Sequence, residues 1–124
     1  MKKIFIILIF IISTNNSIAF ENSSNFTIND FKKAQNDGKV VVVYSWNKFC
    51  GTCAKQKPII KQAQKEFKDL LFMNYEQTKH KDIAKFLKIN FWSTIAVYKN
   101  NQEIAKAIGL NNKEDIYSLI EKGI

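Results

Sequence analysis

The sequence is poor in residues that mark several functional classes. Its 124 residues include no arginine, one proline, one histidine, two cysteines and four glycines. Without arginine, the side chain that nucleic-acid-binding proteins favour for bidentate contacts is absent. All 19 basic residues are lysines spread along the chain, so the net charge of +8 indicates solvated helix faces rather than a nucleic-acid site. A mild preference for acidic partners or anionic membrane surfaces stays open, and the glycines form no phosphate-binding loop.

The first residues have the organisation of a secretory signal peptide. Lys2 and Lys3 precede nine apolar residues, 4–12, and the small residues Ser17 and Ala19 follow. An uncleaved membrane anchor is the alternative, but a spanning helix needs roughly 20 apolar residues. We therefore expect a signal peptide over residues 1–19, cleaved after Ala19, and a periplasmic or secreted protein.

The remaining chain has the length of one domain. Residues 20–25 are polar and predict a mobile lead-in, and residues 26–124 predict a single domain. Apolar runs predict strands at 39–46, 70–75, 93–98 and 103–108, with a turn at 99–102. Helical spacing and cap residues predict helices from about residue 26 to 36, from Cys50 to about 67, from 78 to 87, and after Asn112. This order predicts an α/β fold with a mixed sheet of about four strands flanked by helices.

Both cysteines lie where the most apolar strand meets a helix. Residues 40–43 are four consecutive valines, and Cys50 and Cys53 follow at the start of the helical pattern. A sulfur at a helix N-terminus faces unpaired backbone N–H groups, which favour the thiolate. We therefore expect Cys50 to be the reactive sulfur. Cys53 lies one helical turn further on and is close enough to form a disulfide with it.

From about Phe26 to its end, the chain resembles the thioredoxin-fold family. The resemblance is carried by Trp46, Cys50-Gly51-Thr52-Cys53, Pro58, Thr94 to Asn100, and Gly109. It implies a thioredoxin fold and a protein-disulfide oxidoreductase that needs no cofactor. It also implies a bend of the active-site helix at Pro58. The partners implied are protein disulfides or dithiols, including a membrane or periplasmic redox partner.

Two positions depart from the family pattern. The family places a cis-proline before Thr94, where this chain has Ser93. A cis bond before a non-proline residue costs about 2.5–4 kcal/mol, so Trp92-Ser93 is expected to be trans, with the Ser93 hydroxyl and N–H near the sulfurs. Tyr44 stands where thioredoxins carry a buried carboxylate. A phenol cannot act as a base near neutral pH unless its pKa is strongly shifted, so Tyr44 is expected in the core, and exchange is expected to be slower or more partner-specific.

Other residues near the cysteines have expected places as well. Lys48 is the nearest positive charge in sequence and would favour the thiolate slightly. Gly51 and Thr52 help to set the reduction potential, but they do not fix whether the protein reduces or oxidises its partners. Phe49 and Trp92 are expected to contact partners, whereas Trp46 and Phe91 are expected in the core.

Two alternatives to redox exchange remain. The cysteine pair has the spacing to carry Cu(I) or another thiophilic metal, but Met73 and His80 do not suggest a third ligand, so no metal site is predicted. The other alternative is a binding module that keeps the fold without turnover.

Overall fold

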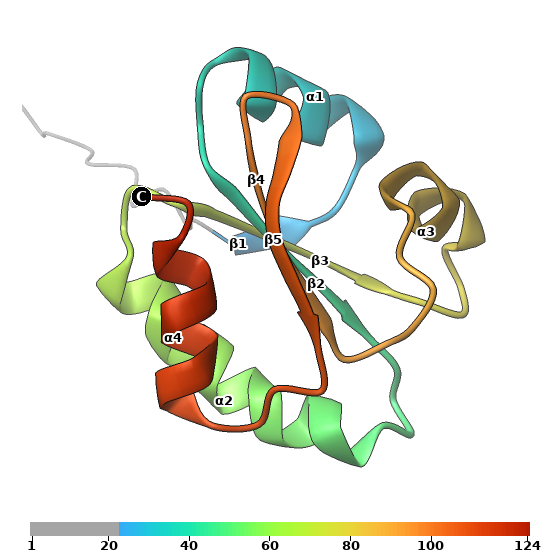
Figure 1. Ribbon diagram of the computed structural model, residues 1–124. Helices are drawn as coiled ribbons and strands as arrows, with labels where there is room; N and C mark the ends of the chain where they lie inside the picture. Colours follow the sequence, from blue (N-terminus) through green and yellow to red (C-terminus); the bar gives the residue numbers. More distant parts are fainter. Residues whose placement is uncertain (1–22) are drawn as a thin grey trace, which may run out of the picture.

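The computed structural model describes residues 23–124, so the predicted signal peptide lies outside the described residues. One five-stranded sheet lies between two pairs of helices, α1 and α3 on one face and α2 and α4 on the other (Figure 1). The elements are β1 Ser23–Asn25, α1 Ile28–Asn36, β2 Val41–Trp46, α2 Gly51–Glu66, β3 Leu71–Glu76, α3 Lys81–Leu87, β4 Thr94–Lys99, β5 Gln102–Ile108 and α4 Lys113–Glu121. The predicted α/β architecture is confirmed, with one strand more than expected.

The sheet has the strand order β1-β3-β2-β4-β5, which places β2 at its centre. Strand β2 runs parallel to β3 and antiparallel to β4. Val41 and Val43 pack in the core that includes α1 and α3, whereas Val42 and Tyr44 pack in the core that includes α2 and α4. Since both faces of β2 are covered, its sequence is apolar almost throughout and does not alternate.

The additional strand is β1, at one edge of the sheet. Ser23 and Ser24 pair with Phe72 and Met73 of β3, and the Phe26 N–H donates to the Asn74 carbonyl at 2.8 Å. Within the predicted mobile lead-in, Ser23–Asn25 therefore form an edge strand that was not expected, while residues 20–22 lie outside the described residues. A short edge strand held by its backbone needs no apolar pattern, so the sequence carried no signal for it.

The predicted turn at 99–102 and the predicted helix start at Asn112 are confirmed, and Thr27 caps α1. The Asp30 N–H donates to Thr27 Oγ1 at 3.1 Å, and the Asp115 N–H donates to Asn112 Oδ1 at 2.9 Å. Asn100 and Asn101 have φ of 53° and 62°, the left-handed conformation that a tight hairpin requires. Helix α3 begins later than predicted, with His80 rather than Thr78 at its N-terminus.

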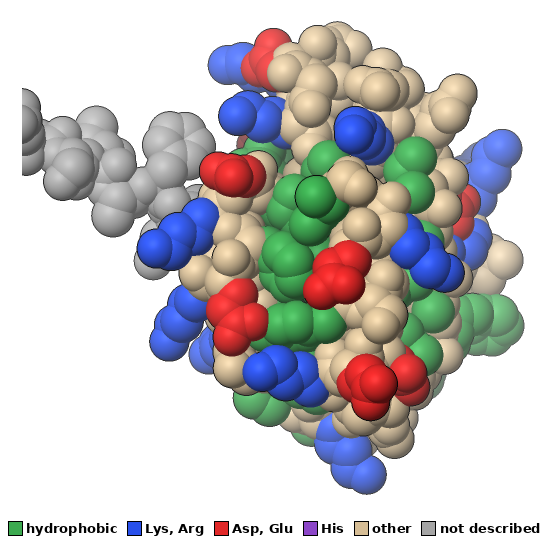
Figure 2. Space-filling model, turned by 60° about the vertical axis from the view of Figure 1, so that its left-hand side comes forward, with side chains coloured by type: hydrophobic (Ala, Val, Ile, Leu, Met, Phe, Trp, Pro, Cys, Tyr) green, Lys and Arg blue, Asp and Glu red, His purple; other side chains and the backbone are tan. Residues whose placement is uncertain are grey.

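Charges of both signs share the surface. On the face shown in Figure 2, lysines and acidic side chains are interspersed around a strip of hydrophobic side chains. On this face the distribution agrees with solvated helix faces rather than with a basic binding surface. Among residues 23–124, no helix combines the length and apolar character needed to cross a bilayer.

Candidate active site

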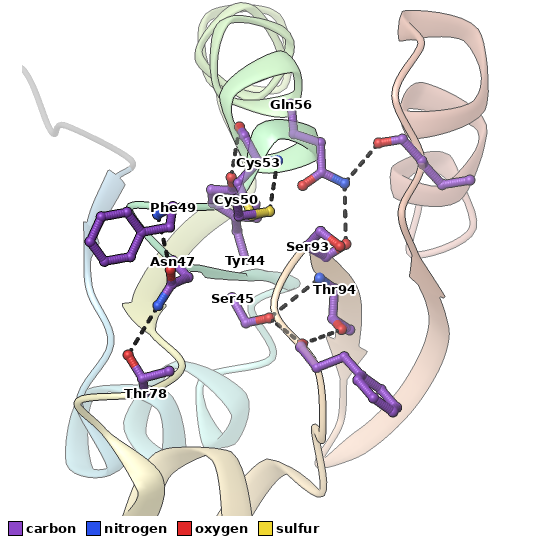
Figure 3. Close-up of a disulfide and its surroundings, with 12 residues drawn as sticks. Tyr44, Ser45, Asn47, Phe49, Cys50, Cys53, Gln56, Thr78, Ser93 and Thr94 are labelled. Carbon is purple, nitrogen blue, oxygen red and sulfur yellow. Dashed lines mark hydrogen bonds between the residues drawn. A yellow bond between two sulfur atoms is a disulfide. The ribbon is translucent and has the colours of Figure 1, made fainter.

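The cysteine pair lies at the junction between β2 and α2, as predicted. Cys50 is the N-cap residue of α2, with extended backbone angles, and its Sγ accepts a hydrogen bond from the Cys53 N–H at 3.0 Å. The two residues form a disulfide, and their Cα atoms are 5.2 Å apart (Figure 3). The helix N-terminus therefore directs a backbone donor at the first sulfur, which is the arrangement that stabilises a thiolate.

The two sulfurs differ in their access to solvent. Cys50 is half-buried, whereas Cys53 is 4% exposed and belongs to the core under α2. A partner disulfide can therefore reach Cys50 directly, whereas Cys53 can react only with a mixed disulfide on Cys50. This difference agrees with the predicted assignment of Cys50 as the attacking sulfur and Cys53 as the resolving one.

Asn47 fixes the loop that leads into Cys50. Its side-chain oxygen accepts from the Phe49 N–H at 3.0 Å, and its carbonyl accepts from the Cys50 N–H at 3.1 Å. Its amide donates to Thr78 Oγ1 at 3.1 Å, and that hydroxyl donates to the buried Glu76 carboxylate at 3.2 Å. Asn47 was not singled out from the sequence. Its polarity at the end of an apolar strand was the only available signal.

Tyr44 lies directly below the second cysteine. Its hydroxyl donates to the Cys53 carbonyl at 3.0 Å (Figure 3). Burial raises the pKa of Tyr44 to about 12. The phenol is therefore neutral near pH 7 and acts as a donor, so it cannot replace the carboxylate as a base. The prediction that Tyr44 is a core residue is confirmed.

The loop before β4 is held by side-chain hydrogen bonds. No cis peptide bond occurs within residues 23–124, so Trp92-Ser93 is trans, and Ser93 has φ of 57°. Ser45 Oγ and Thr94 Oγ1 both donate to the Phe91 carbonyl, at 2.9 and 2.7 Å. The Thr94 N–H in turn donates to Ser45 Oγ at 3.3 Å (Figure 3). The expectation that the Ser93 hydroxyl and N–H lie near the sulfurs stays a prediction.

Gln56 reaches the same loop from α2. Its side chain is fully buried, and its amide nitrogen donates to the Ser93 carbonyl at 3.1 Å and to the Leu110 carbonyl at 2.7 Å. Sequence reasoning missed Gln56. The signal would have been an uncharged polar residue among the inward positions of an amphipathic helix.

The aromatic residues around the site divide differently from the prediction. Phe49 is 85% exposed and Trp92 45%, as a contact surface requires, and the Lys48 Nζ lies 5.1 Å from the Phe49 ring centroid. Phe91 is 61% exposed, so its prediction as a core residue is wrong. It lies in the loop before β4, where no helix covers it. Trp46 is half-buried in the core, and its indole N–H donates to Asn74 Oδ1 at 3.1 Å.

A cleft of about 450 Å³ lies beside the cysteines. Its lining includes both cysteines, Tyr44, Trp46 and, on α2, Lys57. Of the other predicted residues, Thr94 is buried, Thr52 is half-buried, and Gly51 is exposed. Pro58 is an exposed residue inside α2, and the bend expected there stays a prediction.

Side chains for a metal centre are not gathered in the part of the chain that the structure describes. Residues 23–124 contain no cluster of three or more His, Cys, Asp or Glu side chains. The arrangement that they do contain is an accessible sulfur at a helix N-terminus, bonded to a buried sulfur one turn away. Its chemistry is disulfide exchange.

Comparison with known proteins agrees with this site and fold. The thioredoxin family model matches residues 22–122. A thioredoxin of Mycoplasma genitalium is 36% identical over 81 residues, covering 65% of this chain and 79% of that protein. A thioredoxin of Rickettsia felis is 31% identical over 106 residues, covering 82% and 99%.

Solved structures of low sequence identity share the fold. The structure of Trxlp from Edwardsiella tarda superposes with a TM-score of 0.74 at 22% identity, covering 79% of this chain and 97% of that chain. Thioredoxin of Fasciola hepatica gives a TM-score of 0.69 at 20% identity, covering 77% and 93%. The chain therefore belongs to the thioredoxin family, and its Cys50-Cys53 pair is that of a protein-disulfide oxidoreductase.

Proposed function

We propose that this thioredoxin-family protein is exported and exchanges its Cys50-Cys53 couple with partner proteins through a mixed disulfide on Cys50. The observation that carries the exchange is the hydrogen bond from the Cys53 N–H to Cys50 Sγ at the start of α2. Export is supported by the sequence of residues 1–19, which has the basic, apolar and small-residue regions of a signal peptide. The partner class that fits is a protein disulfide or dithiol in the periplasm or at the membrane.

The exchange proceeds in two balanced steps. The Cys50 thiolate attacks one sulfur of a partner disulfide, forming a mixed disulfide and releasing the partner's other sulfur as a thiolate. Cys53 then loses its proton and attacks Cys50 Sγ, which breaks the mixed disulfide and releases the second partner thiolate. The partner gains two electrons and two protons, and the Cys50-Cys53 disulfide forms. The reverse sequence oxidises a partner dithiol.

The proton of Cys53 must leave without help from a carboxylate at position 44. Tyr44 is neutral, and its hydroxyl is engaged with the Cys53 carbonyl. The proton therefore goes to water or to the departing partner thiolate. Where the departing thiolate takes the proton, turnover depends on the partner, because the partner's own sulfur is then the base.

The surface around Cys50 supports a protein as the substrate. Phe49 precedes Cys50 in sequence, and Phe91 and Trp92 lie in the loop before β4, which Gln56 of α2 contacts. All three are large apolar side chains that stay exposed. Exposed aromatic residues beside a reactive group are typical of protein contact surfaces. We assign Phe49 and Trp92 to the partner contact, as their sequence positions predict.

A trapping experiment tests the exchange. Cys53→Ser should accumulate a mixed disulfide with a model protein disulfide such as insulin, because Cys50 attacks and nothing resolves the product. Cys50→Ser should accumulate none, since Cys53 is buried. Trapping on Cys53 alone would contradict the assignment, and stoichiometric copper in protein that does not exchange would favour a metal carrier.

Wild-type protein, which keeps both cysteines, tests direction and export. Equilibration of the Cys50-Cys53 couple with glutathione should place its reduction potential within roughly −270 to −120 mV. A value near the lower end indicates a reductase, and one near the upper end indicates an oxidant of dithiols. The intact mass of protein recovered from the exported fraction should correspond to a chain that begins at Phe20. A chain that keeps residues 1–19 and stays inside the cell would contradict export.

A further inference from the structure

Gln56 is a polar side chain in an apolar environment. It lies one helical turn after Cys53, and the other buried residues of α2 are Cys53, Ile60 and Ala63. Its exposed fraction is 0%, and its Oε1 atom has no hydrogen-bond partner among the described residues. A buried amide with an unpaired oxygen is unfavourable for folding, so its two donor bonds are the reason to look for a function.

The two donor bonds join three segments of the chain. The Gln56 Nε2 donates to the carbonyl of Ser93, before β4, and to that of Leu110, after β5. The Ser93 carbonyl also accepts from the Gly109 N–H at 3.0 Å. Figure 3 shows the Gln56 amide between Ser93 and the segment that leads to α4. One side chain of the active-site helix therefore holds both ends of the β4-β5 hairpin.

The loop before β4 depends on such bonds for its shape. Ser93 has φ of 57°, a conformation that a non-glycine residue adopts only when its surroundings hold it. No proline fixes the backbone of residues 91–94. The side chains that bond to this loop are those of Ser45, Thr94 and Gln56. Of the three, Gln56 is the one that bonds to Ser93 itself, beside the backbone bond from the Gly109 N–H.

We propose that Gln56 is a positioning residue for exchange with protein partners: it ties the Ser93 backbone to the active-site helix and so fixes the loop that carries the exposed side chains of Phe91 and Trp92. This inference rests on the proposed exchange function. Cys50 itself is held separately, by the N-terminus of α2 and by Asn47. Gln56 therefore acts on the capture of a large partner and not on the chemistry of the sulfurs.

The test compares two substrates of different size. Reduced Gln56→Met keeps the shape of the side chain but has no donor. Its second-order rate constant with insulin disulfides should fall about ten-fold relative to wild type, the effect of losing hydrogen bonds to backbone acceptors. Its rate constant with a small aromatic disulfide should stay within about two-fold of the wild-type value. Its reduction potential, measured against glutathione, should equal that of wild type within error. Equal losses with both substrates, or no loss with either, would overturn the inference.

Two further variants keep the test informative. Gln62→Met, on the exposed face of the same helix, should match wild type with both substrates. Gln56→Glu regains one donor only when its buried carboxyl is protonated. Its insulin rate, divided by that of wild type, should therefore rise as the pH is lowered from about 8 to about 5.5. A flat ratio would overturn the inference even if Gln56→Met does not fold.

The outcome for wild type separates this inference from the proposed function. A wild-type protein that exchanges with neither substrate would refute the proposed function as well. An active wild type whose rates are matched by Gln56→Met refutes only the assignment of Gln56.

Discussion

Among single residues, the buried tyrosines link stability to alkaline pH. Burial raises the pKa of Tyr44 to about 12, and it also raises the pKa values of Tyr75 and Tyr98. The unfolded chain ionises its tyrosines near pH 10. The stability that these tyrosines contribute is therefore fully present below about pH 10. It is lost as the pH rises through their folded pKa values.

Tyr44→Phe separates this structural role from a catalytic one. Loss of the hydroxyl leaves the Cys53 carbonyl without its side-chain donor and should lower the free energy of unfolding by about 1 kcal/mol at pH 7. The variant should also lose less stability than wild type between about pH 9 and pH 11, because one raised tyrosine is gone. Urea denaturation at pH 7 measures the first effect, and the difference in unfolding free energy between about pH 9 and pH 11 measures the second. A shift in the pH profile of disulfide exchange near neutrality would instead show that the phenol takes part in proton transfer.

The residues that could be predicted at the site are those whose chemistry is local in sequence. Cys50 and Cys53 are recognisable because their spacing alone places them on one helical turn. Asn47 and Gln56 were not recognisable, because their partners Thr78 and Ser93 lie 31 and 37 residues away. Phe91 was predicted wrongly because its apolar character says nothing about whether a helix covers it.

At the scale of elements, the loop before β4 carries the partner contact that we propose for Trp92. Its backbone is anchored by Ser45, Thr94 and Gln56, while Trp92 stays 45% exposed. An anchored backbone with a free aromatic side chain loses little conformational freedom when it binds. This element is therefore suited to recognition without being part of the sulfur chemistry.

Trp92→Ala should weaken exchange with protein disulfides while leaving the Cys50-Cys53 potential nearly unchanged. Removal of an aromatic contact at an interface typically costs about 1–2 kcal/mol, or roughly ten-fold in rate constant. The rate constant is measured from the turbidity of reduced insulin, a signal that does not depend on tryptophan. The reduction potential is measured by equilibration with glutathione. Ile104→Ala, at a similarly exposed apolar side chain on β5, serves as the control. An altered potential with normal partner kinetics would refute the assignment of Trp92.

Most elements were predictable because their signals agree with one another. The valines of β2 are buried on both faces, and Thr27 and Asn112 cap the helices that follow them. Strand β1 was not predictable, because Ser23 and Ser24 pair through their backbones with a strand about 50 residues later. The start of α3 was placed too early because Thr78 has the character of a cap residue but is bonded to Asn47 and Glu76.

For the whole molecule, the end of the chain closes the core between α4 and the sheet. Gly123 is buried, and a Cβ atom at this position would lie 2.6 Å from Val97 Cγ1 and 2.9 Å from Val40 Cγ1. Val97 belongs to β4, and Val40 precedes β2. Gly123, two residues after α4, is therefore packed against β4 and the residue that precedes β2, and its small size is required by contact rather than by backbone angle.

Gly123→Ala should lower the free energy of unfolding by about 1–3 kcal/mol, the usual effect of adding a methyl group to a filled core. Thermal denaturation followed by circular dichroism measures the change in Tm. Lys122→Ala, at the exposed neighbouring position, should leave the Tm close to that of wild type. An unchanged Tm for Gly123→Ala would mean that the chain end moves away from the sheet at no cost.

The positive φ of Ser93 also bears on the family pattern stated above, in which a proline precedes the threonine. Proline is confined to φ near −65°, more than a hundred degrees from the backbone angle of Ser93, 57°. A single Ser93→Pro exchange thus cannot restore the arrangement of that pattern. We expect that residues 91–94 would have to be replaced together, along with Ser45 on β2 and Gln56 on α2, because both side chains bond to the present backbone of this loop.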